Sequence, residues 1–205
     1  MPRTKTQIKE YFRDYIYGFI FNDIRNCIKA KANYTVALAL LSYTDYLGGL
    51  INGTLGLQNK SKDQFNKALE YFEWKGDQNY YKNFKIRFKD IDFTSKEGDI
   101  YSLFRCGLAH EYFIKGDSLV HNNPDGYTDE KGKYYCDGCI DEDAGVQIIN
   151  EGNKKRLRLH NNAYFRDFEK AWEKYYNELV EKENKDLLKN FNNALDRIAV
   201  REIEF

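Results

Sequence analysis

Apolar residues recur every three or four positions along much of this chain, which is the spacing of a helix that buries one face. The first such run covers residues 6–31 and predicts a long amphipathic helix. A second run, from residue 34 to about residue 57, is apolar around most of its circumference, so we expect its helix at the centre of the fold. Gly49 and Gly53 lie one turn apart in this run and predict a close approach by another helix.

The middle of the chain gives shorter signals. Ser61 and Gln64 have the spacing of a capping box and predict the start of a helix that covers residues 65–74. Residues 77–94 are rich in Tyr, Phe and Lys, and we expect a short helix around residues 80–88. Apolar positions at helical spacing then predict a helix that is capped by residue 94 or 95 and ends near Gly116.

The pattern changes after Gly116, where clusters of turn-forming residues follow. Residues 145–149 and 155–160 have the short alternating pattern of two strands joined by a turn. Helical spacing then returns and predicts helices at residues 163–182 and 186–200.

The composition agrees with one helical domain. A chain of 205 residues can bury one sizeable core, and only two prolines interrupt its helices. We therefore predict a mainly α fold in which residues 1–205 form a single helical bundle. A loop and a small β-hairpin, at about residues 117–161, are inserted between the later helices.

Charge and cysteine usage narrow the class of protein. Lys and Arg number 32, as do Asp and Glu, so the net charge is zero and any binding to nucleic acid requires a local basic patch. No apolar run is long enough to cross a membrane, and no secretory signal is visible. With four cysteines in such a chain, we expect reduced thiols and a cytoplasmic protein that does not associate with membranes.

Arg105 and His110 are a polar pair on an otherwise apolar helix. A histidine can transfer a proton at neutral pH, and an arginine can grip phosphate oxygens with two donors. Because the neighbouring 2′-hydroxyl of RNA can attack the phosphate, the pair suits phosphodiester cleavage without a metal. Five residues of an α-helix turn through roughly 140°, so the flexible guanidinium would have to reach around the helix. From spacing alone, a surface pair or a capped helix end is the alternative.

The segment Arg105-Cys-Gly-Leu-Ala-His110 resembles the R-x-x-x-x-H motif of the HEPN superfamily. HEPN domains are helical bundles, and many are metal-independent endoribonucleases that act as toxins or antiviral defence effectors. They usually dimerise so that two motif helices face each other and form a composite site. The resemblance implies an RNA-cleaving homodimer without a cofactor, in which Arg105 grips the phosphate and His110 transfers the proton.

Cys106 is a departure from the family pattern, because active members commonly carry Asn, Asp or His directly after the arginine. Members without activity serve as binding modules or pair with antitoxins. A catalytically silent module that dimerises, or that docks an antitoxin or other protein partner, is therefore the alternative function.

A second candidate site is the basic strand at residues 154–160. Period-two alternation places Leu157 and Leu159 on one face and a set of basic residues on the other, which could follow an RNA backbone. Residues 141–143 are acidic and could instead balance a solvated strand face, the interpretation we favour slightly. The candidate RNA-binding residues are Lys155, Arg156, Arg158 and His160.

Cys136 and Cys139 form a C-x-x-C pair, which is half of a tetrahedral zinc site. Only His121 and His160 are suitable to complete it, so two reduced thiols in a loop are the default interpretation and zinc is the alternative.

The run at residues 80–88 interleaves aromatic and basic residues. Such a run could stack on single-stranded RNA, although packing at the edge of the core is the commoner use of this pattern.

Overall fold

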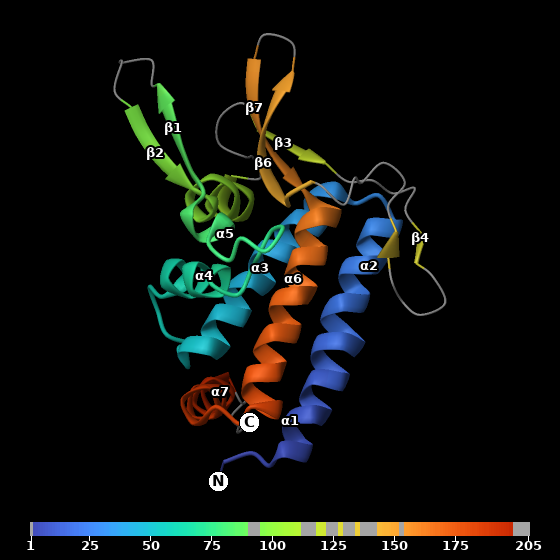
Figure 1. Ribbon diagram of the computed structural model, residues 1–205, viewed down its shortest axis with the longest axis vertical. Helices are drawn as coiled ribbons and strands as arrows, with labels where there is room; N and C mark the ends of the chain where they lie inside the picture. The colour runs from blue at the N-terminus through green and yellow to red at the C-terminus, as the bar shows by residue number, and fades with distance from the viewer. Residues whose placement is uncertain are drawn as a thin grey trace, which may run out of the picture.

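The computed structural model describes residues 2–89, 95–111, 118–121, 127–128, 134–135, 143–151 and 154–198. The protein is mainly α-helical, with a small β-hairpin between its later helices, as the sequence predicts (Figure 1). None of the helices within these ranges is both long and apolar enough to cross a membrane.

The first predicted helix is confirmed and runs without a break through three segments. These are α1 (Lys5–Tyr11), the π-helical η1 (Phe12–Phe21) and α2 (Asn22–Lys29). Thr4 caps the start by a reciprocal capping box with Gln7.

Helix α3 (Asn33–Asn52) lies at the centre of the bundle, in agreement with its apolar circumference. It ends earlier than predicted because Gly53 adopts a left-handed conformation, with φ of 65°. Its neighbours include α4 (Ser61–Leu69), α6 (Asn161–Tyr176) and α7 (Lys185–Ile198). The π-helical η4 (Asn177–Glu181) extends α6, and together they confirm the helix predicted at residues 163–182.

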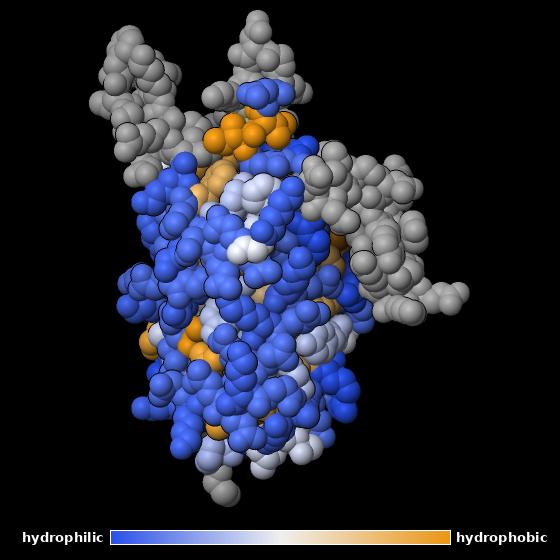
Figure 2. Space-filling view, in the orientation of Figure 1, coloured by the Kyte–Doolittle hydropathy of each residue, from blue (hydrophilic) through white to orange (hydrophobic). Residues whose placement is uncertain are grey.

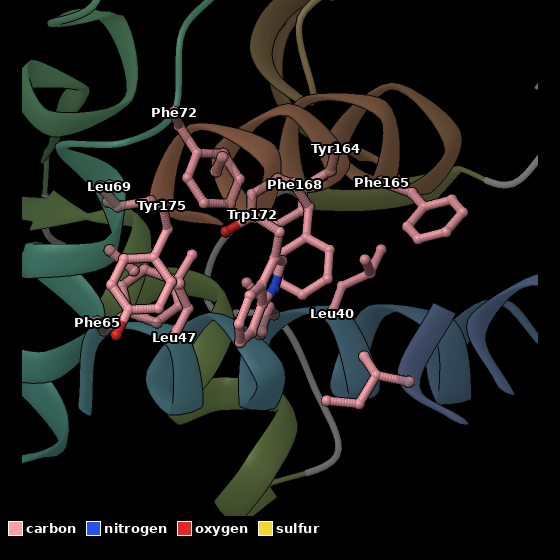
Figure 3. Close-up of a cluster of buried hydrophobic side chains, with 14 of the residues drawn as sticks. Leu40, Leu47, Phe65, Leu69, Phe72, Tyr164, Phe165, Phe168, Trp172 and Tyr175 are labelled. Atoms are coloured by element: carbon pink, nitrogen blue, oxygen red, sulfur yellow. The ribbon is translucent and has the colours of Figure 1, made fainter. Parts of the chain in front are cut away.

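The core between α3 and α6 is mostly aromatic (Figure 3). Trp172 is fully buried and makes edge-to-face contacts with Phe12 and Phe168. Edge-to-face geometry is favourable because the positive edge of one ring meets the negative face of another. Aromatic side chains therefore join the first helix to α6, through contacts of Phe12 and Phe21 with rings of α6.

A three-stranded sheet carries the predicted hairpin. Strands β6 (Val146–Glu151) and β7 (Lys154–His160) are antiparallel, and β3 (Ser118–His121) adds a parallel partner for β7 that the sequence did not predict. Figure 2 shows a mostly hydrophilic face of the molecule, with apolar surface just below the tip of the β6–β7 hairpin. A further pair joins β4 (Tyr127–Thr128) to β5 (Tyr134–Tyr135).

The predictions for the middle of the chain were partly wrong. Helix α5 (Tyr80–Asn83) is short, and β1 (Lys85–Lys89) pairs with β2 (Ser95–Asp99) where we expected helix. The Ser61 capping box is also wrong, because α4 begins at Ser61 itself without a side-chain cap. Gln64 instead donates to the carbonyl oxygen of Thr54, at 2.8 Å, and so ties α4 to the loop after α3.

Burial of Glu169, which forms an ion pair between α2 and α6, makes stability depend on pH. Arg25 Nη2 lies 2.5 Å from Glu169 Oε1. Burial raises the pKa of Glu169 to about 7, against the opposing effect of Arg25. The folded state therefore binds this proton more tightly than the unfolded chain, where the pKa of Glu is 4.5, and the unfolding free energy falls as the pH rises from about 4.5 to 7.

Glu169→Gln keeps an acceptor for Arg25 but cannot titrate. We expect it to flatten the decrease in unfolding free energy between pH 4.5 and 7, measured by urea denaturation. Glu183→Gln, at an exposed pair with Lys5, is the control and should leave the slope unchanged. An unaltered slope in Glu169→Gln would mean that this carboxyl does not carry the effect.

Candidate functional site

The motif helix consists of η2 (Tyr101–Arg105), Cys106 and η3 (Gly107–Glu111), seen in olive green behind α5 in Figure 1. It starts later than predicted because residues 95–99 form β2. Asp99 and Ser102 exchange hydrogen bonds at its start: the Ser102 amide donates to Asp99 Oδ1, and the Asp99 amide donates to Ser102 Oγ. One face of the helix packs into the core through Ile100, Leu103, Phe104 and Leu108.

The motif helix is π-helical, and this changes the relation between Arg105 and His110. In a π-helix the hydrogen bonds join residues five apart, so such residues lie close to the same side of the helix. The Cys106 amide donates to the Tyr101 carbonyl. Arg105 and His110 are also five residues apart, with Arg105 at the end of η2, His110 in η3 and Cys106 between the two π-helical segments. The π-helical winding of these segments brings residues five apart nearer to one side of the helix than the roughly 140° of an α-helix. The side chain of His110 is outside the described part of the structure.

Arg105 is held by Asp45 of α3. Its Nε lies 2.7 Å from Asp45 Oδ2, and the two side chains are 20% and 11% exposed. The guanidinium carbon also lies 5.9 Å from the centre of the Tyr101 ring. Within the described residues, Asp45 is the hydrogen-bond partner of the Arg105 side chain. The contact uses Nε, and neither terminal Nη group has a hydrogen-bond partner among the described residues; these are the donors that an incoming anion would contact.

Asp45 is an unusual carboxylate because it lies in the most apolar helix of the protein. Burial raises its pKa to about 6, against the opposing charge of Arg105 and the hydrogen bond from Arg105. Its Oδ1 atom is buried and has no hydrogen-bond partner among the described residues. Removing Arg105 would leave a buried carboxylate without its ion pair, which is why the two residues must be considered together.

The candidate RNA-binding residues of the basic strand do not form one exposed basic face in the structure. Arg158 Nη2 forms a 3.1 Å ion pair with Asp143 Oδ2, which is one of the acidic residues expected to balance this face. The side chains of Lys155 and Arg156 lie outside the described part. His160 is buried, with 1% exposure, and therefore does not belong to a solvent-facing stripe.

His160 is buried because the strand ends there and a helix begins. Its Nδ1 accepts a hydrogen bond from the Ala163 amide and so caps α6. At a strand-to-helix junction, the direction of the side chain is set by the hydrogen bonds of the helix terminus rather than by the alternation of the strand.

Of the four residues considered for zinc, the structure brings two together. His121 and His160 are register partners in the parallel pairing of β3 with β7. Cys136 and Cys139 are outside the described residues, so the zinc hypothesis is untested. No group of three or more metal-ligating side chains occurs in the part of the chain that the structure describes. Cys27 and Cys106 are free thiols.

Sequence reasoning missed Asp45 as a member of the site. The signal was an acidic residue within the longest apolar run, which usually needs a buried cationic partner. The sequence could not say which base that partner was, because Arg105 is 60 residues away. No family model, curated protein or solved structure matches this chain.

Proposed function

We propose that this protein is a metal-independent endoribonuclease of the HEPN type that acts as a homodimer. The observation that carries the proposal is the Arg105–Asp45 contact through Nε, in which the Nη edge of the guanidinium has no partner among the described residues and can contact a phosphate. The π-helical winding of η2 and η3 adds support, because residues five apart lie nearer to one side of a π-helix than of an α-helix.

In the proposed reaction, the 2′-hydroxyl of RNA attacks the adjacent phosphorus while its proton passes to a base. The new bond joins the 2′-oxygen to phosphorus, and the bond from phosphorus to the 5′-oxygen breaks as that oxygen takes a proton. His110 provides the proton transfer, either alone or with His110 of the second subunit, and Arg105 stabilises the charge that builds on the phosphate oxygens. The products carry a 2′,3′-cyclic phosphate and a 5′-hydroxyl.

The test is cleavage of single-stranded RNA by the purified protein in excess EDTA. We expect cyclic phosphate ends by mass spectrometry and no cleavage of an RNA with 2′-O-methyl groups throughout. Equal cleavage of the methylated RNA, or activity that EDTA abolishes, would refute the mechanism.

Asp45→Asn tests how Arg105 is positioned. Asn can still accept from Nε but lacks the charge that holds the guanidinium, so we expect cleavage about tenfold slower, from weaker phosphate positioning. The loss should be smaller than that in Arg105→Ala. Asp196→Asn, at an exposed ion pair with Arg3, is the matched control and should cleave like the wild type. If both variants have wild-type activity, Asp45 does not position Arg105.

The alternative function is a catalytically silent module that dimerises or docks an antitoxin or other protein partner. It is favoured by the same ion pair, because Asp45 offsets the charge of Arg105, and by Cys106 in place of the usual polar residue. A stable dimer by light scattering, together with intact RNA after prolonged incubation, would support this alternative over the ribonuclease.

A further inference from the structure

A cleft opens beside the start of the motif helix and is not part of the Arg105 site. It has a volume of about 490 Å³, which is within the range of small-molecule sites. Its walls come from α4, from α5 with the first residue of β1, and from Asp99 and Ile100 at the start of the motif helix. Those last two residues make the cleft continuous with the helix that carries Arg105.

Lysines from two sides surround the cleft, with an excess over its acidic residues. Lys62 and Lys67 come from α4, and Lys82 and Lys85 come from α5 and β1. The acidic residues in the lining are Asp63, Glu70 and Asp99. Asp63 is also paired outside the cleft, with Lys60 at 3.3 Å, and Asp99 is paired with Lys62 at 3.4 Å. The four lysines against three carboxylates leave the lining with an excess of one positive charge.

Glu70 holds two of these lysines side by side. Lys67 Nζ lies 2.6 Å from one of its oxygens, and Lys82 Nζ lies 3.0 Å from the other. Partial burial raises the pKa of Glu70, but the hydrogen bonds from the two lysines prevail and lower it, so the carboxylate stays ionised. One negative charge thus positions two ammonium groups, and a phosphate can contact both without moving either far.

The remaining walls suit an uncharged aromatic group. Phe84 is half-buried and lines the cleft, where its ring can stack on an aromatic ligand. The side-chain amides of Asn52 and Asn66 make no hydrogen bond to the described residues, so their donors and acceptors are available to a base edge. Aromatic stacking with a neighbouring cationic groove is the general chemistry of single-stranded RNA recognition.

We infer that this cleft binds a nucleotide of single-stranded RNA and feeds the strand toward Arg105. Lys67 and Lys82 hold the phosphate, and Phe84 stacks on the base. The inference deepens the proposed function and rests on it for the identity of the ligand as RNA. It also gives the aromatic and basic run at residues 80–88 a use in RNA binding rather than in packing alone.

The experiment measures binding of a fluorescein-labelled single-stranded RNA by anisotropy, with His110→Ala as the parent so that cleavage does not interfere. Adding Lys67→Gln and Lys82→Gln should weaken binding about tenfold at low salt and reduce the log–log salt slope by about 1.4, because each contact to a single strand contributes about 0.7. Phe84→Leu keeps the apolar volume but removes the ring, and should weaken binding at every salt concentration with an unchanged slope.

The matched control is Lys185→Gln with Lys189→Gln, two exposed lysines of α7 at the other end of the bundle (Figure 1). It should bind RNA like the parent. An equal loss of binding in the control would show that any surface lysine contributes through general electrostatic attraction, and would refute RNA binding in the cleft. Parental binding by Lys67→Gln with Lys82→Gln would refute it as well. Cleavage by the wild type is scored separately: binding through the cleft without cleavage refutes only the proposed function, and cleavage without cleft-dependent binding refutes only the cleft.

Discussion

Alanine at His110 is expected to reduce RNA cleavage by about 10²–10⁴-fold at neutral pH, which is the contribution of a positioned acid or base. Alanine at Arg105 should have an effect of similar size, because it removes the donors that stabilise the developing charge. The two losses should not add in the double variant if the residues act on one transition state.

The measurement is a single-turnover rate on a short RNA in EDTA, with binding recorded in parallel. Arg105→Lys separates charge from geometry, since lysine keeps the charge but lacks the two Nη donors, and we expect it to recover little activity. Arg13→Ala, at an exposed pair with Asp14, removes an arginine elsewhere and should cleave like the wild type. Wild-type rates in His110→Ala would remove that residue from the mechanism.

Long amphipathic runs made most of the helices predictable from sequence. The run at residues 6–31 leaves no choice of face, because a different register would expose Phe12, Ile16 and Ile24 together. The run at residues 85–89 was harder. Its alternation fits a strand, but β2 has no apolar alternation of its own, so the pairing depends on contacts that a local pattern does not contain.

The candidate site was predictable only in part. The motif identified Arg105 and His110. Over five residues, however, an apolar stripe fits α-helical and π-helical winding equally well, so the sequence could not predict the angle between the two residues around the helix axis. The Asp45 contact depends on how α3 lies against the motif helix. That arrangement is set by packing of the whole bundle, which also determines which glycines on α3 face a neighbour.

Alanine at Gly48 is expected to destabilise the protein by about 3 kcal/mol or more, because a Cβ there would overlap the backbone of α4. The added carbon would lie 1.6 Å from the carbonyl oxygen of Gln64. Backbone cannot rotate away as a side chain can. Helix α4 is further fixed by the hydrogen bond from the Gln64 side chain to the carbonyl oxygen of Thr54. The close approach predicted from Gly49 and Gly53 is therefore tightest one residue earlier.

Gly49→Ala is the matched control, since it gains the same helix propensity in the same helix, about 1 kcal/mol. Its Cβ would lie 2.4 Å from a carbon at the end of the Leu55 side chain, which can change rotamer. We expect a net change near zero there, against a fall in the thermal midpoint of about 6–12 °C for Gly48→Ala. A change near zero in both variants would mean that α4 is free to move away from α3. In that case α4 would not hold Lys67 in a fixed position beside the cleft. The tight packing of α4 against α3 and the proposed RNA-binding cleft would then both be refuted.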